Sequence, residues 1–156
     1  KILDIGSGTG IFPYQLKKNN LDVTCIEKDI NLSEHLRKNL SLKVIKNNYN
    51  DKKLKSKFDV ISLNKVLEHI DEPNSFLKKI SYFLKKKGYI YFEVPDAQIA
   101  STKNKNREEL FVEHVHGFSK KSIKLFFLSN KYSILKIKTI LEPSGKYTIY
   151  GFVKKT

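Results

Sequence analysis

A glycine-rich turn near the start of the chain has the residue types needed to hold a nucleoside. The segment reads Lys1-Ile2-Leu3-Asp4-Ile5-Gly6-Ser7-Gly8-Thr9-Gly10. Glycine has no β-carbon, so the backbone can turn tightly and approach a ligand closely. Amides that open the next helix then point toward that ligand. The turn is G-x-G-x-G followed by Ile11, whereas the dinucleotide fingerprint is G-x-G-x-x-G or alanine around a pyrophosphate. The pattern favours an adenosyl ligand without a pyrophosphate; the alternative is an ordinary glycine-rich turn.

An acid follows the second predicted strand, about 20 residues after the glycine turn, which is the spacing of a cofactor-binding acid. This residue is Glu27, in the segment Val23–Lys28. A carboxylate at the tip of a strand in a doubly wound sheet faces the crevice and can accept hydrogen bonds from both ribose hydroxyls. Asp4 stands at the tip of the first predicted strand. The alternative for Glu27 is a surface acid beside Lys28.

These residues together resemble the first motif of the class I S-adenosylmethionine-dependent methyltransferases. The resemblance implies S-adenosyl-L-methionine as the cofactor, with Asp4 near its methionine end and Asn64 beside its methionine moiety. It places Asn48 and Tyr49 at the adenine, although many relatives have an acid at the position of Asn48, and plain loop residues are the alternative. The implied cofactor contacts are Asp4, Gly6, Ser7, Gly8, Gly10, Glu27, Lys28, Asn48, Tyr49 and Asn64.

A second motif concerns activation of the methyl acceptor. The segment Glu113–Ser119 reads Glu-His-Val-His-Gly-Phe-Ser. It is similar to the Glu-His-x-x-x-Phe-Ser signature of a small-molecule group that includes sugar C-methyltransferases and enzymes of quinone and cell-surface polysaccharide biosynthesis. The similarity implies His114 as a general base, oriented by Glu113, acting on a hydroxyl or an activated carbon. The alternatives are that His116 is the working imidazole, or that Glu113 and His114 only pin a loop. Leu67-Glu68-His69 is similar to a recurring family segment and is expected to organise its own loop.

Strand and helix patterns alternate along the chain, which predicts an α/β fold with a Rossmann-like, doubly wound sheet. The sheet is mostly parallel, but the last two strands are joined by too few residues for a helical crossover and form an antiparallel hairpin. An apolar stripe at helical spacing predicts a helix from Glu72 through Leu84 that ends at a Gly88 cap, and 96–107 is expected to be irregular. The predicted strands are 2–5, 22–26, 43–46, 58–63, 89–94, 133–140 and 147–154, and the other predicted helices are 11–19, 29–40 and 119–130, which completes the seven-stranded methyltransferase fold.

Composition indicates one domain, residues 1–156, with a net charge of +14. The lysines are scattered, and we expect no interleaving of aromatic residues with them of the kind that a stacking platform requires. We therefore expect a solvated basic surface, with a polyanion partner or an acidic substrate as the alternative. One cysteine and the lack of metal-ligand spacing predict no disulfide, no metal site and a cytoplasmic location. No apolar run approaches the ~20 residues that span a bilayer. Because the chain begins inside a strand, we expect the N-terminal cap of such enzymes to be missing from it.

The predicted function is methyl transfer from S-adenosyl-L-methionine to an oxygen or carbon of a small metabolite, such as a sugar, a polysaccharide precursor or a quinone-like acceptor. RNA methylation on ribose or base is one alternative. Amino-group base methyltransferases generally carry Asn/Asp-Pro-Pro-aromatic after the fourth strand, where this chain has Asn64-Lys65-Val66-Leu67. Carbon-5 cytosine chemistry needs a cysteine in the site, and Cys25 lies in the second predicted strand. A non-catalytic relative that binds the cofactor or a partner protein is the other alternative.

Overall fold

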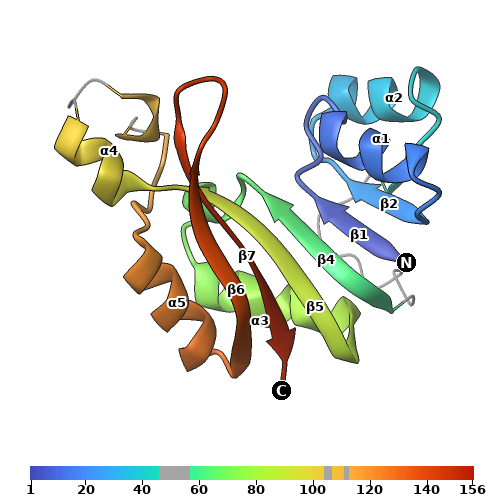
Figure 1. Ribbon diagram of the computed structural model, residues 1–156. Helices are drawn as coiled ribbons and strands as arrows, with labels where there is room; N and C mark the ends of the chain where they lie inside the picture. The colour runs from blue at the N-terminus through green and yellow to red at the C-terminus, as the bar shows by residue number, and fades with distance from the viewer. Residues whose placement is uncertain (46–56, 104–106, 111–112) are drawn as a thin grey trace.

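The described residues form a seven-stranded sheet with helices on both of its faces (Figure 1). The computed structural model describes residues 1–45, 57–103, 107–110 and 113–156. Strand order across the sheet is β3-β2-β1-β4-β5-β7-β6. The strands are β1 (Ile2–Ile5), β2 (Val23–Ile26), β3 (Lys43–Ile45), β4 (Phe58–Asn64), β5 (Leu84–Pro95), β6 (Tyr132–Leu141) and β7 (Tyr147–Lys155).

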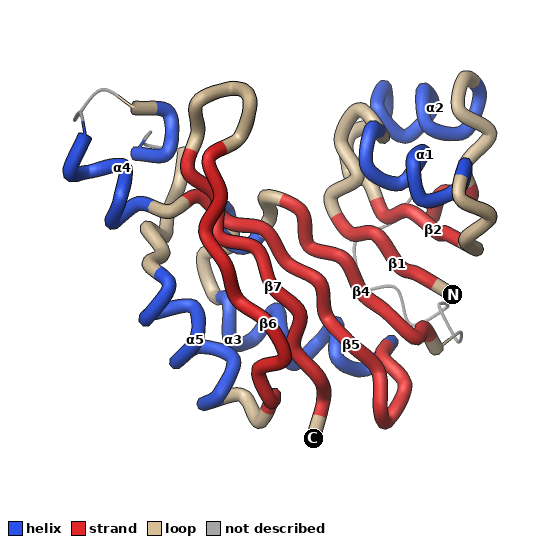
Figure 2. Tube along the Cα trace, viewed as in Figure 1, coloured by secondary structure: helices blue, strands red, loops and turns tan. Residues whose placement is uncertain are grey.

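Helices cover the two faces unequally (Figure 2). One face packs α1 and α2 over β1–β3, in a small cluster built on Cys25 and Leu36. The other face packs α3 and α5 against the centre of the sheet. The helices are α1 (Ile11–Lys18), α2 (Ile30–Lys38), α3 (Pro73–Ile80), α4 (Ala97–Lys103) and α5 (Lys120–Ser129), with short 3₁₀ turns η1 (Leu67–His69), η2 (Ser81–Phe83) and η3 (Glu108–Leu110). None of the described helices is long and apolar enough to cross a membrane.

Strand directions confirm the predicted topology. β1 pairs in parallel with β2 and β4, and β4 pairs in parallel with β5. β7 runs antiparallel to both of its neighbours, β5 and β6. Successive strands run outward from β1 in one direction and from β4 in the other, so the strand order reverses between these two strands. Ligands of open α/β sheets bind at such a reversal, beyond the carboxyl ends of the strands, and this fixes where the site must lie.

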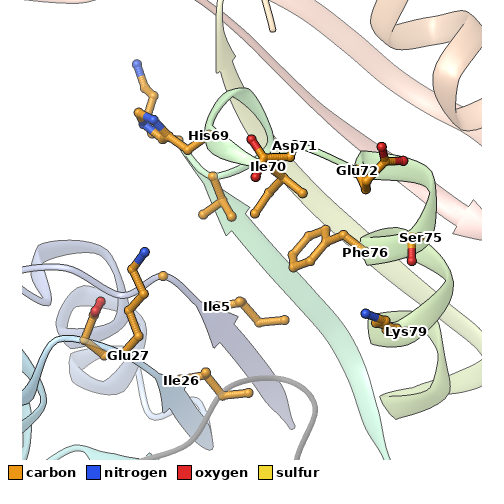
Figure 3. Close-up of a pocket in the computed structure, with 14 residues that line it drawn as sticks. Ile5, Ile26, Glu27, His69, Ile70, Asp71, Glu72, Ser75, Phe76 and Lys79 are labelled. Atoms are coloured by element: carbon orange, nitrogen blue, oxygen red, sulfur yellow. The ribbon is translucent and has the colours of Figure 1, made fainter. Parts of the chain in front are cut away.

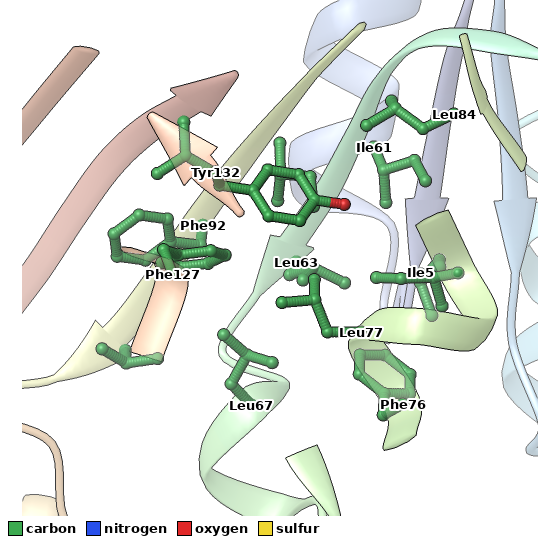
Figure 4. Packing of buried hydrophobic residues seen from close by; sticks show 14 of the residues in the cluster. Ile5, Ile61, Leu63, Leu67, Phe76, Leu77, Leu84, Phe92, Phe127 and Tyr132 are labelled. Atoms are coloured by element: carbon green, nitrogen blue, oxygen red, sulfur yellow. The ribbon is translucent and has the colours of Figure 1, made fainter. Parts of the chain in front are cut away.

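The main core lies between the sheet and the helices α3 and α5 (Figure 4). Side chains of the central strands that point to this face are fully buried, and Phe92 of β5 packs on Phe127 of α5 with ring centroids 4.7 Å apart. Alternate residues of a strand point to opposite faces. Consequently, the inward set leaves Asp4 and Ser62 on the opposite face, where the carboxyl and the hydroxyl meet.

Helix starts follow the local capping chemistry of the sequence. Asp29 caps α2 by accepting a hydrogen bond from the Leu32 amide at 2.9 Å. Ser119 caps α5 through a reciprocal pair of bonds with Ser122. Such side chains satisfy amides that the first helical turn leaves without a partner. The predicted start of the 119–130 helix is thus confirmed.

The predicted helix through Leu84 is wrong in its second half. α3 ends at Ile80, and the chain passes through η2 into β5, which begins at Leu84. Gly88 is a buried strand residue, not a helix cap. A β-carbon there would lie 2.7 Å from the Leu84 side chain and 3.0 Å from the Asp59 carbonyl oxygen. Glycine at this position lets the Leu84 side chain and the Asp59 carbonyl approach the backbone closely inside the sheet. The helical spacing of the preceding apolar residues gives no sign of this requirement.

The segment expected to be irregular, 96–107, contains the helix α4. Its start is fixed by Asp96, whose Oδ1 accepts a hydrogen bond from the Ile99 amide at 3.1 Å. Oδ2 of the same buried carboxylate accepts a bond from the Thr139 hydroxyl at 2.9 Å. The capping signal was present in the sequence, but the polar composition of the segment masked it.

Lysines and aromatic residues do alternate on one surface, contrary to the expectation from the sequence. The face of β5, β7 and β6 opposite α5 carries Tyr89, Tyr150 and Phe152, brought together from different strands. Lys154 lies over the Tyr89 ring at 5.9 Å, and Lys136 lies over the Tyr150 ring at 5.3 Å. Pairing between strands creates this pattern, so it is absent from the linear order of residues.

Candidate active site

A cleft of about 700 Å³ opens beyond the carboxyl ends of β1, β2 and β4 (Figure 3). Ile5 and Ile26, the last residues of β1 and β2, provide an apolar floor, and Phe76 of α3 faces them. Glu27 lies at one end of the cleft and His69 at its rim. Because drug-sized ligands occupy pockets of about 300–1,000 Å³, the cleft is large enough for a nucleoside-sized molecule.

Glu27 holds the glycine turn in place from the tip of β2. One carboxylate oxygen, Oε2, accepts a hydrogen bond from the Gly8 amide at 2.7 Å, and Oε1 accepts one from the Asp29 amide at 3.0 Å. The side chain is buried, with only 7% of its residue surface exposed. Each carboxylate oxygen has a further lone pair, so both can still accept a hydroxyl. The surface-acid alternative for Glu27 does not fit this burial.

The glycines of the turn serve different purposes. Gly6, Gly8 and Gly10 all have positive φ angles, at +73°, +52° and +85°. A β-carbon at Gly10 would lie 2.4 Å from Leu36 Cδ2, so this glycine lets α1 pack on α2. Among the described residues, no atom lies within 4 Å of the place that a β-carbon at Gly8 would take. Gly8 thus needs glycine for its left-handed backbone and not for close packing, and its amide is bonded to Glu27.

Asp4 is a buried acid at the tip of β1. Its Oδ1 accepts a hydrogen bond from the Ser62 hydroxyl at 2.6 Å, while the Ser7 hydroxyl donates to its backbone carbonyl at 3.3 Å. Burial raises the pKa of the Asp4 carboxyl to about 6, although the Ser62 bond opposes the rise. The negative charge of Glu27 raises this pKa further, because the two acids share one end of the sheet. Ser62 was not predicted as a site residue, yet a hydroxyl inside the apolar run of the fourth strand was a readable signal.

The other predicted cofactor residues lie at the same edge or outside the described residues. Lys28 lines the cleft and is exposed. Asn64 is the last residue of β4 and lies opposite Glu93 of β5. Asn48 and Tyr49, predicted at the adenine, lie outside the residues that the structure describes. Burial raises the pKa of Cys25 to about 12, so this thiol is unsuited to nucleophilic chemistry.

The histidines of the second motif meet η1 beyond β4. His69 and His114 are in edge-to-face contact, with ring centroids 5.0 Å apart. His69 Nδ1 is bonded to the Glu113 backbone carbonyl at 3.0 Å, and His114 Nδ1 to the Glu109 carbonyl at 3.1 Å. The orienting partner of His114 is thus the Glu109 carbonyl, while Glu113 contributes its own carbonyl to His69. Among the described residues, no hydrogen bond joins the Glu113 carboxylate to His114.

Glu68 is the third residue of the group that His69 and His114 form. It is 1% exposed, and neither carboxylate oxygen has a hydrogen-bond partner among the described residues. Burial raises the pKa of Glu68, and the neighbouring His69 and His114 pull it the other way. His116 is turned elsewhere, with its Nε2 bonded to the Asp71 carbonyl at 3.2 Å. The loop-pinning expectation for this segment agrees with these bonds, but pinning leaves the Glu68 carboxylate unexplained.

Comparison with known protein families shows which family this chain belongs to. A model described as a methyltransferase domain matches residues 1–136. The chain belongs to this family. Ubiquinone biosynthesis O-methyltransferase of Schizosaccharomyces pombe is 30% identical over 96 residues, which are 56% of this chain and 35% of that protein. The enzyme of the same name from Colwellia psychrerythraea is 30% identical over 108 residues, 65% of this chain and 44% of that protein. The chain spans less than half the length of these curated relatives.

Solved structures agree with this methyltransferase fold. An S-adenosylmethionine-dependent methyltransferase of Thermotoga maritima, described as a possible histamine N-methyltransferase, has a TM-score of 0.79 at 21% identity and covers 100% of this chain and 82% of its own. The 1,6-didemethyltoxoflavin-N1-methyltransferase of Burkholderia thailandensis, solved with bound 1,6-didemethyltoxoflavin and S-adenosylhomocysteine, has a TM-score of 0.77 at 14% identity. The match covers 99% of this chain and 70% of that chain. At such identities the likeness establishes the fold.

Proposed function

We propose that this methyltransferase domain transfers the methyl group of S-adenosyl-L-methionine to an oxygen or carbon atom of a small metabolite. The observation that carries the proposal is the buried Glu27 carboxylate, bonded to the glycine turn at the mouth of a cleft of about 700 Å³. When bound, the cofactor supplies a methyl group on a sulfonium, which is a good leaving group. The family, the fold and these local contacts all agree with this reaction.

The residues present fit the cofactor. Glu27 keeps free lone pairs for the two ribose hydroxyls, and the Gly8 amide is bonded to the same carboxylate. Asp4, held by Ser62, places a second carboxyl at the adjacent strand tip, where an ammonium or sulfonium charge is favoured. The net charge of +14 opposes a cationic ligand only weakly, because charges beyond about 8 Å are screened at physiological ionic strength.

The acceptor is best sought among small hydroxyl compounds, including quinone precursors. His69 lines the cofactor cleft and His114 contacts its ring, with centroids 5.0 Å apart, so an imidazole stands where a group could activate a hydroxyl. The named activity of the two curated relatives is O-methylation in ubiquinone biosynthesis. Sugars and polysaccharide precursors remain in the same proposal, because a histidine can act as general base on a hydroxyl of either class. A cytoplasmic location remains a prediction.

Two measurements test the proposal. Isothermal titration with S-adenosylhomocysteine should give one binding site per chain, and Glu27→Gln should lower the affinity of that site. Turnover should then be measured on a panel of catechols, phenols and nucleotide sugars. His114→Ala is expected to keep the cofactor affinity and to lower turnover. Failure of the wild-type chain to bind S-adenosylhomocysteine would contradict the proposed function, whereas binding without turnover on any acceptor would favour the non-catalytic alternative.

RNA methylation remains the second candidate because of the lysine and tyrosine face on β5–β7. Bases stack on exposed aromatic rings, and lysines neutralise the backbone. Lys136 and Lys154 lie over Tyr150 and Tyr89 on this face. Fluorescence anisotropy with a labelled single-stranded RNA tests it. Affinity that falls steeply with salt and is lost in Tyr89→Ala and Tyr150→Ala would favour RNA.

A further inference from the structure

Three side chains capable of binding a metal converge where β4 ends and the 113–116 segment crosses it. One ligand atom from each of Glu68, His69 and His114 lies within 4.8 Å of the other two. They come from two segments separated by more than forty positions, held together by backbone bonds such as His116 N to Glu68 O at 3.2 Å. We propose that these three residues form a binding site for a divalent transition-metal ion, with zinc as the first candidate.

The buried carboxylate of Glu68 is the first argument. A carboxylate removed from water is costly unless it is paired or coordinates a metal. Glu68 is 1% exposed and, among the described residues, both of its oxygens are without a hydrogen-bond partner. The nearby cation Lys65 is engaged elsewhere, since its Nζ lies 2.7 Å from Glu142 and 2.6 Å from the Thr148 hydroxyl. A divalent ion would balance the Glu68 charge at the place where the chain itself does not.

The orientation of the imidazoles is the second argument. A backbone carbonyl only accepts hydrogen bonds, so the Nδ1 atoms of His69 and His114 must carry the protons in their bonds to Glu113 O and Glu109 O. In the neutral ring, Nε2 then keeps its lone pair for a metal. Metal-ligating histidines almost always donate their other ring nitrogen in this way, to a carbonyl, a carboxylate or water. Both rings therefore already have the outer hydrogen bond that such a site needs.

The donor set indicates the kind of ion. Two imidazoles with one carboxylate suit zinc or another divalent transition metal, whereas calcium and magnesium prefer oxygen ligands. Zinc ligands lie about 2.0–2.2 Å from the ion, so the three atoms must draw closer than their present 4.8 Å limit. His69 is exposed and His114 is half-buried, and their rings can make this adjustment. Sites with three protein ligands keep a further position open.

The open position gives the ion a role, and this last step rests on the proposed function. His69 lines the cleft in which we place cofactor and acceptor. A hydroxyl of the acceptor that binds the ion would have a lower pKa, as water bound to zinc does. Its proton then leaves to solvent and the oxygen keeps the electron pair for attack. In this arrangement His114 binds the metal through Nε2, so it acts as a ligand in place of a general base.

The test uses the full chain, freed of metal by dialysis against chelator. Isothermal titration with Zn²⁺ should give one site per chain, and Co²⁺ should give visible d–d absorption bands. Loss of outer-shell partners typically costs 10–100-fold in affinity, so loss of a ligand in Glu68→Gln, His69→Ala or His114→Ala should cost at least ~100-fold. His35→Ala and His116→Ala are matched controls, because the chain has only these two other histidines, and both should retain the site.

The outcomes separate this inference from the proposed function. Each variant is checked for folding by circular dichroism and for its thermal shift with S-adenosylhomocysteine, neither of which depends on the metal. No zinc binding by the wild type, or equal loss in the control variants, would overturn the metal site while leaving the cofactor site intact. If His114→Ala lowers turnover of a wild type that binds no metal, His114 is the general base. Absence of cofactor binding with intact zinc binding would instead reject the proposed function alone.

Discussion

Replacing Asp4 by asparagine should stabilise the domain at neutral pH and weaken its site. The Asp4 carboxyl is 2% exposed and bonded to the Ser62 hydroxyl at 2.6 Å. An asparagine has nearly the same shape, and its side-chain carbonyl can accept the same bond from Ser62. The substitution therefore removes the buried charge and leaves its main contact in place.

The magnitude follows from the pKa of Asp4, which burial raises from 3.8 to about 6 in the folded state. Below about pH 4 the carboxyl is protonated in both states, so its contribution is complete there. As pH rises from about 4 to about 6, the unfolded chain ionises first, and the free energy of unfolding falls. Each pKa unit corresponds to 1.36 kcal/mol, so the wild type should lose about 3 kcal/mol across this window. Asp4→Asn escapes that loss.

Urea unfolding of wild type and Asp4→Asn between about pH 4 and pH 7.5 measures the difference. The variant should be up to about 3 kcal/mol more stable at pH 7.5, and the gap should close toward pH 4. Asp59→Asn is the control, because the pKa of the exposed Asp59 is lowered to about 2 by Lys85 and the chain terminus. It should show no gain over the same window. A stability difference that does not change with pH, or an Asp4→Asn variant less stable than the wild type, would refute the reasoning. The affinity of Asp4→Asn for S-adenosylhomocysteine should be lower than that of the wild type.

Four further substitutions probe the glycine turn, its partner Glu27 and a helix start. Gly10→Ala should cost about 2–4 kcal/mol in urea unfolding, since it adds a clash with Leu36 to a left-handed backbone; Gly8→Ala, with the strain alone, should cost about 1–2 kcal/mol, and equal costs would contradict this distinction. Ser119→Ala should lower the free energy of unfolding by about 1 kcal/mol, because it removes the helix cap. An unchanged urea midpoint would show that the cap does not stabilise the domain. Glu27→Gln should weaken S-adenosylhomocysteine at least ~10-fold by calorimetry, because one acceptor oxygen becomes a donor; wild-type affinity would remove Glu27 from the site.

Local chemistry explains which parts of the fold the sequence predicts. The glycine turn and the Ser119 cap depend on neighbours within a few residues, so their types and spacing are sufficient. The helix predicted through Leu84 is wrong because its apolar stripe continues at helical spacing into β5. Leu84 instead pairs with Phe58 across the sheet, and Gly88 fits against Leu84. Such strand pairing is a non-local demand that a single segment does not record.

The same distinction separates the two halves of the candidate site. Asp4 lies one residue before the end of β1 and Glu27 directly follows β2, so both could be placed together from the sequence, because the ends of neighbouring parallel strands meet at one edge. The grouping of Glu68 and His69 with His114 was not predictable, and the sequence was expected to hold no metal site. Adjacent residues such as Glu68 and His69 match no ligand spacing by themselves. Only the return of the 113–116 segment over η1, held by the His69 bond to Glu113 O, brings the third side chain to them.

The reversal of strand order between β1 and β4 explains why these two groups can work on one molecule. β1 ends in the glycine turn and lies beside β2, which ends at Glu27; β4 runs on into η1 with Glu68 and His69. Because β1 and β4 are hydrogen-bonded neighbours, Gly6 and Glu27 line the same cleft as His69. The proposed cofactor residues Glu27 and the glycine turn belong to adjacent strand ends. His114 comes from the segment that follows β5, so we expect changes in 113–119 to alter the choice of acceptor while leaving cofactor affinity unchanged.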